Sequence, residues 1–232
     1  MHIVTVDIAV DWITDKIYWT NSNKIMVYDL QRGYQATVIN STEPGTSLNQ
    51  VLVDPTTRYC VYIFNYIMWV EIHISSHTCT VSTLYWSDIG SIPKIGKASM
   101  DGSGNKTVIK NTDWHHKLVF TLDISQQVLY WINGTRSCYL QSSNTDGSGR
   151  RIAYNASYTY GRCPNYYYMH TSQAIDFFGG AVYSYSSYSY RYIHRTMIEG
   201  TPSISRYSYN YYTCRSGTSL KVISRERQLQ ST

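Results

Sequence analysis

One spacing recurs along this 232-residue chain: an aspartate stands seven residues before a tyrosine, and tryptophan follows the tyrosine. A repeat at fixed offsets constrains the fold more than any single motif, because every copy must form the same small unit. Two copies are intact, namely Asp11 with Tyr18 and Trp19, and Asp123 with Tyr130 and Trp131.

Two further copies are altered. Asp176 stands seven residues before Tyr183, but a serine takes the place of the tryptophan. Asp54 and the pair Tyr85-Trp86 lie 31 residues apart, which is 24 more than in the other copies. With that excess removed, the chain is predicted to contain one repeating unit in four copies.

Each copy continues with a short polar turn, an apolar segment, a turn that contains glycine, and another apolar segment. Gly102 and Gly147 lie in Asp-Gly turns between such segments, a pattern typical of β-hairpins. The chain also has 24 tyrosines against 4 phenylalanines and no capped helical stretch, so strands are favoured. Each unit is therefore predicted to be four short strands, with a period of roughly 45 residues.

Four-stranded units of about this length are typical of β-propeller blades. A stacked sandwich is the alternative architecture, but it would not require one repeating unit. Because propeller blades pack face to face, the aromatic pair on the second strand is predicted to fill the wedge between neighbours. The sequence thus predicts an all-β propeller with four clear four-stranded blades.

These motifs resemble the YWTD β-propeller of the low-density-lipoprotein-receptor family, which also occurs in nidogen-like and sevenless-type proteins. The resemblance rests on "IAVDWITDKIYWTNS", "LYWSDIGSIPKIGKASMDG", "LDISQQVLYWINGTRSCYLQSSNTDGSGRR" and "SLKVISRERQ". The four-letter motif is never intact, and only the second copy keeps its aspartate, Asp88. Bonds between blades are therefore expected to be weaker at the other copies.

The resemblance implies a six-bladed ring, of which this chain supplies four blades and, in residues 219–228, the strand that begins the last blade. Residues 1–232 are thus expected to be a single, incomplete propeller domain from a longer polypeptide. The family implies an extracellular, non-catalytic module of a receptor-like or matrix protein. Such a module binds a protein ligand or serves as a scaffold, and it flanks EGF-like modules.

Residues 59–83 form an insertion of uncertain origin within the second copy. One interpretation is a hydrophobic hairpin closed by a Cys60–Cys79 disulfide, since long loops cost little stability. A zinc site would use the spacing of Cys60, His73 and His77, but the other cysteine pair of a zinc finger is absent. The third interpretation is a translated intron, because excision restores the spacing of the other copies.

No nucleophile elbow, metalloprotease motif or phosphate-binding glycine loop occurs in the sequence, so we predict no catalytic residue, metal ligand or cofactor. The aspartate that recurs once per copy is expected to be structural. Two alternatives stay open. The tyrosine-rich segment "YSYSSYSYRY" suggests a matrix or fibre assembly protein, and some propellers are metal-dependent hydrolases.

Four N-x-S/T sequons fit an exported protein. We predict glycans on Asn40, Asn105 and Asn155, whereas Asn133 occupies the aspartate position of the motif and is expected to face the neighbouring blade. The chain has five cysteines, so at least one is free or pairs outside it. No apolar stretch is long enough to cross a membrane as a helix.

Residues 150–232 contain ten lysines and arginines against three aspartates and glutamates. In a propeller this charge would lie on one sector of the disc and favour an acidic partner, such as a sulfated glycan or an acidic protein segment. Nucleic acid is not expected to meet an exported module. The residues predicted to contact an acidic ligand are Arg191, Arg195, Lys221, Arg225 and Arg227.

Overall fold

The fold is described from a computed structural model of the chain. The structure describes residues 5–55, 66–67, 70–71, 82–110, 118–133, 139–155, 172–186, 192–198 and 203–208.

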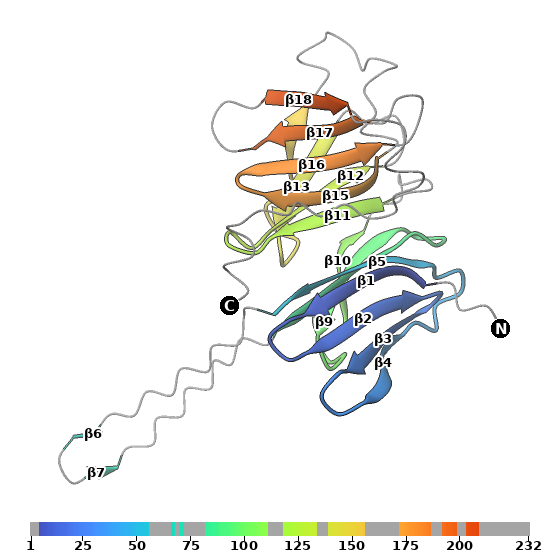
Figure 1. The fold of residues 1–232 in the computed structure, drawn as a ribbon, viewed down its shortest axis with the longest axis vertical. Coiled ribbons are helices and arrows are strands. Elements are labelled where there is room, and N and C mark those ends of the chain that lie inside the picture. Colours follow the sequence, from blue (N-terminus) through green and yellow to red (C-terminus); the bar gives the residue numbers. More distant parts are fainter. Residues whose placement is uncertain are drawn as a thin grey trace.

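These residues form strands and turns, with no helix among them. Four antiparallel sheets of four strands each account for most of them, and we name these sheets blades 1 to 4 in chain order (Figure 1). The prediction of an all-β fold built from a repeated four-stranded unit is therefore confirmed.

Each blade takes its strands in chain order. Blade 1 contains β1 (Thr5–Asp11), β2 (Lys16–Asn21), β3 (Lys24–Asp29) and β4 (Tyr34–Asn40). Blade 2 contains β5 (Leu48–Asp54), β8 (Thr83–Asp88), β9 (Lys94–Ser99) and β10 (Lys106–Lys110). Blade 3 contains β11 (Leu118–Asp123), β12 (Val128–Asn133), β13 (Tyr139–Asn144) and β14 (Arg151–Asn155). Blade 4 contains β15 (Ser172–Phe178), β16 (Ala181–Ser186), β17 (Tyr192–Met197) and β18 (Ser203–Ser208).

The blades follow one another through their first strands. β1 contacts β5, β5 contacts β11, and β11 contacts β15. In Figure 1 the blue sheet of blade 1 lies in front of the green strands of blade 2, and the orange sheet of blade 4 lies in front of blade 3. The chain therefore forms a curved row of sheets in which each blade packs on the next.

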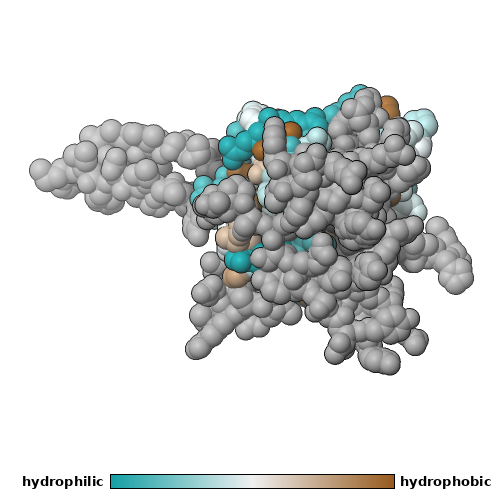
Figure 2. All heavy atoms as spheres, turned by 90° about the horizontal axis from the view of Figure 1, so that it is seen from above, coloured by the Kyte–Doolittle hydropathy of each residue, from teal (hydrophilic) through white to brown (hydrophobic). Residues whose placement is uncertain are grey.

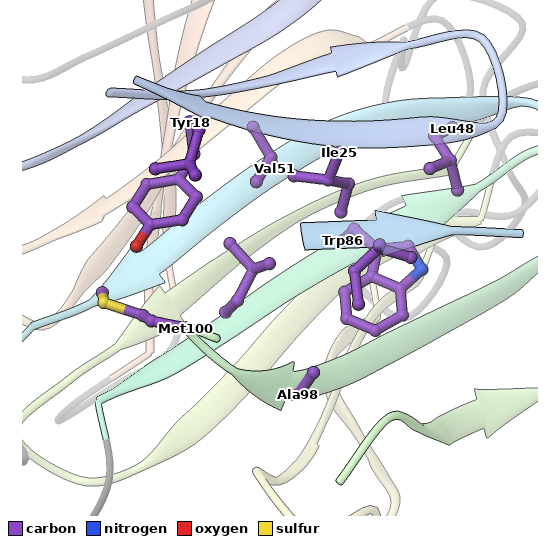
Figure 3. Packing of buried hydrophobic residues seen from close by; sticks show 10 residues of the cluster. Tyr18, Ile25, Leu48, Val51, Trp86, Ala98 and Met100 are labelled. Atoms are coloured by element: carbon purple, nitrogen blue, oxygen red, sulfur yellow. The ribbon is translucent and has the colours of Figure 1, made fainter. Parts of the chain in front are cut away.

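The hydrophobic core lies between the blades rather than within one layer. The cluster between blades 1 and 2 brings Tyr18 and Ile25 of blade 1 against Val51, Trp86 and Met100 of blade 2 (Figure 3). A second cluster lies between blades 2 and 3, and a third between blades 3 and 4. Burial of apolar area at these interfaces is the main favourable contribution to the fold.

The long insertion leaves blade 2 intact. Asp54, the last residue of β5, pairs directly with Thr83, the first residue of β8, so the hairpin ladder starts in the same register as in blades 1 and 3. Within the insertion, β6 (Tyr66–Ile67) and β7 (Val70–Glu71) pair as a separate two-stranded sheet, away from the blades (Figure 1). The proposed Cys60–Cys79 disulfide and the histidines of the zinc interpretation lie outside the described residues.

The described surface carries few hydrophobic residues on the face shown in Figure 2. Most described residues there are hydrophilic, and the hydrophobic ones form small separate spots.

Candidate functional site

The repeated aspartate ends the first strand of blades 1 and 3, where it shapes the turn to the second strand. The Asp11 carboxylate accepts hydrogen bonds from the amides of Ile13 (3.0 Å) and Thr14 (3.2 Å), and also from the Thr14 hydroxyl. Asp15, four residues after Asp11, then takes a positive φ of 52°. This is an Asx-type turn, in which a short carboxylate replaces a backbone acceptor.

Asp123 builds the same turn in blade 3. Its carboxylate accepts from the amides of Ser125 (3.0 Å) and Gln126 (3.1 Å), and Gln127 takes a φ of 53°. The carboxylates of Asp11 and Asp123 are both buried. Both carboxylates accept hydrogen bonds from their own turns.

Asp54, the repeated aspartate of blade 2, has a partner in the next blade. The side-chain amide of Gln127 in blade 3 donates to the Asp54 carboxylate at 2.9 Å, and also to the Ile124 carbonyl at 3.0 Å. Asp54 is fully buried. The repeated aspartate thus joins two blades at this position.

Blade 4 departs from the repeat in its first hairpin. Gly179 and Gly180 have φ of 55° and 68° and form a two-residue turn, so Asp176 lies directly opposite Tyr183. In blade 3, by contrast, Asp123 lies opposite Val128, two residues before the tyrosine. The spacing of seven residues is preserved in the sequence, but two successive glycines favour a tighter turn that shifts the register. Asp176 is buried all the same.

The tyrosine and tryptophan of one pair point to opposite neighbours, because successive strand residues face opposite sides of a sheet. In blade 2, Trp86 packs against blade 1, whereas Tyr85 packs against blade 3. In blade 3, Trp131 packs against blade 2, and Tyr130 stacks on Phe177 of blade 4 with ring centroids 5.3 Å apart. In blades 2 and 3 the tryptophan therefore packs at the interface with the preceding blade, and the tyrosine packs at the interface with the following blade. Tyr18 and Tyr85 are fully buried, and Trp19 is only partly buried.

At the interface between blades 3 and 4 the tryptophan position is held by Ser184. Ser184 lies opposite His194 of the neighbouring strand, and both residues are buried. In blade 2 the corresponding pair is Trp86 opposite Gly96, where a Cβ on the glycine would lie 2.4 Å from the indole ring. In blade 2 the ring is the indole on the second strand, β8, and it faces glycine. In blade 4 the ring is the imidazole of His194 on the third strand, β17, and it faces serine.

The one aspartate that completes the four-letter motif has a defined partner. Asp88 is buried and accepts from the amides of Ser47 and Gly90, both at 2.9 Å. Ser47 belongs to the connection that leads from blade 1 into β5. Asp88 therefore fixes the connection from the preceding blade. At the position of this aspartate, blade 1 has Asn21 and blade 3 has Asn133.

A second set of bonds between blades was not found by sequence reasoning. The amide of Val51 donates to the Asp7 carboxylate (3.0 Å), one blade earlier. Gln50 binds the backbone of Phe120 twice: it accepts from the amide at 3.0 Å and donates to the carbonyl at 2.9 Å. Asp7 and Gln50 each stand four residues before the repeated aspartate of their blade. This common position is the sequence feature that could have indicated a shared role in binding the next blade.

The interface between blades 3 and 4 has a related bond. The amide of Phe177 donates to the Thr121 hydroxyl at 3.0 Å. The first strands of successive blades are thus connected by side chains that act on backbone groups.

The predicted glycosylation sites differ in exposure. Asn40, at the end of β4, and Asn105, in the β9–β10 turn, are exposed. Asn155 is half-buried at the end of β14, and the side chain of Asn133 is outside the described part of the structure. Of the residues predicted to contact an acidic ligand, only Arg195 is described, and its Nε donates to the Tyr183 hydroxyl at 3.1 Å.

Tyr85 provides a test of burial at the interface of blades 2 and 3. Removal from water raises the pKa of its phenol from 10 to about 12, and the nearby Asp54 carboxylate adds to the rise. The folded state therefore holds the proton more tightly than the unfolded state. The resulting stability is complete below pH 10 and is lost as the pH rises from 10 through 12.

We expect the free energy of unfolding to fall by about 2–3 kcal/mol over this interval because of Tyr85. The Tyr85→Phe variant lacks the ionising group, so its decline should be smaller by this amount. Denaturant titrations at pH 9 and pH 12 measure the difference. Equal declines in the two proteins would contradict the assignment.

Among the described residues, no group of three or more histidine, cysteine, aspartate or glutamate side chains is placed to hold a metal ion. A search of the same residues finds no helix long and apolar enough to cross a membrane.

Comparison with known proteins gives sequence and structural relatives. No family model matches the chain. The chain is 38% identical over 69 residues to the vitellogenin receptor Yl of Drosophila melanogaster, a match covering 29% of this chain and 3% of the receptor. It is 29% identical over 147 residues to the vitellogenin receptor of Solenopsis invicta, covering 62% of this chain and 7% of that receptor. The chain therefore matches only a small part of either receptor.

Among solved structures, a chain of a nidogen/laminin complex superposes with a TM-score of 0.51 at 16% identity, covering 84% of this chain and 76% of that one. At this identity the likeness concerns the fold. It agrees with the repeated motif and with the receptor matches, and together they support a YWTD-type β-propeller similar to those of the low-density-lipoprotein-receptor family.

Proposed function

We propose that this chain is an extracellular, protein-binding propeller of a receptor of the low-density-lipoprotein-receptor type. The observation that carries the proposal is the sequence match to two insect vitellogenin receptors over parts of the repeat. The structural likeness to a chain from a nidogen/laminin complex supports the same class, since that complex joins two proteins. EGF-like modules are the neighbours that we propose in the longer polypeptide.

We propose further that the propeller acts by binding and not by catalysis. The use of the repeated carboxylates supports this: Asp11 and Asp123 cap their own turns, and Asp54 binds Gln127. These buried carboxylates are hydrogen-bonded to turns and to the next blade, which supports a structural role for them.

Vitellogenin is the first protein ligand to test, because both relatives carry its name. We would measure vitellogenin binding to the full natural polypeptide and to a version in which this propeller is exchanged for the nidogen propeller. The exchange keeps the fold and changes the surface. We expect a loss of affinity of tenfold or more, which corresponds to about 1.4 kcal/mol. Unchanged affinity would mean that this propeller is not the binding module.

We also propose, more narrowly, that the positively charged segment of residues 150–232 binds an acidic protein segment or a sulfated glycan. Arg150 and Arg151 are exposed at the start of β14, and Arg150 lies over the Trp131 ring at 5.5 Å. Retention on immobilised heparin should fall when Lys221, Arg225 and Arg227 are neutralised together. Elution below physiological salt would argue that the charge only aids solubility.

We predict that Asn105 and Asn40 carry glycans when the protein is secreted. Both asparagines are exposed, and the hydroxyl residues of their sequons, Thr107 and Thr42, are exposed as well. Glycopeptide mapping measures the occupancy of each site. Asn133 serves as the internal comparison, and full occupancy there with none at Asn105 would contradict the strand assignment.

A further inference from the structure

The interface between blades 3 and 4 contains most of the buried hydroxyl groups that lack a hydrogen-bond partner. Four such hydroxyls occur in the part of the chain that the structure describes, and one of them, on Ser87, belongs to blade 2. The other three belong to Ser142, Ser184 and Thr196, each of which is 1% exposed. Buried polar groups of native proteins are nearly always hydrogen-bonded, so these three hydroxyls need an explanation.

The strand register shows that the hydroxyl of blade 3 faces blade 4. Ser142 lies opposite Tyr130, whose ring stacks on Phe177 of blade 4. Directly opposed residues of an antiparallel pair lie on the same face of the sheet. Ser142 is therefore directed into the interface between blades 3 and 4.

The two hydroxyls of blade 4 face back toward blade 3. Ser184 lies opposite Ile175, and Thr196 lies opposite Val182. Both of these opposing residues belong to the hydrophobic cluster between blades 3 and 4. His194, on the other side of Ser184, is buried as well and adds an imidazole to the same surface. The two blades thus bring hydroxyl groups to one interface from both sides.

The spacing of these residues suits a bridge better than a direct bond. A direct bond between hydroxyls needs oxygen atoms about 2.7–2.8 Å apart. Ser184 and Thr196 are diagonal neighbours on adjacent strands, which lie about 7–8 Å apart, and their side chains are short. One water molecule joins two oxygen atoms that are about 5–6 Å apart, since it bonds to each of them.

The interface also has more room than its counterpart between blades 2 and 3. At the position of the tryptophan, blade 3 has Trp131 opposite Gln141, whereas blade 4 has Ser184 opposite His194. The serine and the imidazole together are smaller than the indole and the glutamine side chain. The space that an indole fills in blade 3 is therefore filled less completely in blade 4, and it is lined by polar groups.

We propose that Ser142, Ser184 and Thr196 form a buried water site that joins blade 3 to blade 4. A buried water makes about three hydrogen bonds to polar groups that otherwise have none, and a hydroxyl can both donate to water and accept from it. The site joins the blades where an indole does so at the two preceding interfaces. The inference does not depend on the proposed receptor function.

Thr196→Val tests the site because it removes the hydroxyl and keeps the shape of the side chain. Loss of a hydrogen bond to water should lower the denaturant midpoint of the natural polypeptide, whereas loss of an unbonded hydroxyl from a dry interface should raise it or leave it unchanged. Thr20→Val is the matched control, since the Thr20 hydroxyl is also buried and accepts from the amide of Asp7 at 3.1 Å. We expect both variants to lower the midpoint. A higher or unchanged midpoint for Thr196→Val would overturn the proposal.

Ser142→Ala combined with Thr196→Val tests whether one site joins the two blades. If both hydroxyls bind the same water, the double variant should lower the midpoint by less than the sum of the two single shifts. Additive shifts would show separate partners and would overturn the shared site. A crystal structure of the natural polypeptide should show ordered water within about 3 Å of hydroxyls from both blades, and a dry interface would contradict the proposal.

Discussion

Replacing Trp131 with alanine is expected to lower the free energy of unfolding by about 3–5 kcal/mol. The indole is fully buried between blades 2 and 3, where it packs with Tyr85 and Phe120. Its removal leaves a cavity that rigid strands on both sides cannot close. Equilibrium denaturation of the purified chain measures the change.

Trp19→Ala is the matched control. Trp19 holds the same position in blade 1 but is only partly buried, so about 1 kcal/mol or less is expected in residues 1–232. Losses of the same size at Trp19 and Trp131 would contradict the view that a neighbouring blade makes the tryptophan important.

Gly102→Ala is expected to cost about 3 kcal/mol, from backbone strain and overpacking together. Gly102 has a φ of +86°, and a Cβ there would lie 2.2 Å from the Val38 carbonyl oxygen of blade 1. The turn cannot retreat without separating blade 2 from blade 1.

Gly104→Ala separates the two causes. Gly104 also has a positive φ, of +63°, but a Cβ at this position would meet no heavy atom within 4 Å. Only the strain remains, and about 1–2 kcal/mol is expected. Thermal unfolding of both variants measures the difference, and an equal cost would show that the contact with Val38 carries no weight.

The architecture could be predicted from the sequence because its signals are local. The seven-residue offset of Asp11 from Tyr18 and the Asp-Gly turn at Gly102 each lie within one hairpin, where chain connectivity fixes the geometry. The repeat then shows that the hairpins assemble into equal units. The placement of Trp86 and Trp131 between blades followed from the size of the indole and the shape of the wedge.

The bonds between blades could not be predicted in the same way, because they join distant residues. Gln50 and Phe120 are 70 residues apart, and nothing near Gln50 in the sequence indicates its partner. The turn in blade 4 was missed for another reason. The offset of Asp176 from Tyr183 is normal, and only the geometry of Gly179 and Gly180 reveals the shifted register.

The pairing of Ser184 with His194 affects how such a repeat can change over evolutionary time. In blades 2 and 4 the wedge is filled by one ring and one small facing residue, since Trp86 lies beside Gly96 and His194 beside Ser184. Ser184→Trp alone would overpack the interface, and His194→Gly alone would leave a hole, so each single change lowers stability.

The two changes together restore a ring next to glycine, and their effects are therefore not additive. A direct exchange between the two arrangements would pass through a less stable intermediate, whereas Trp131 opposite Gln141 in blade 3 shows that a buried tryptophan does not require a facing glycine.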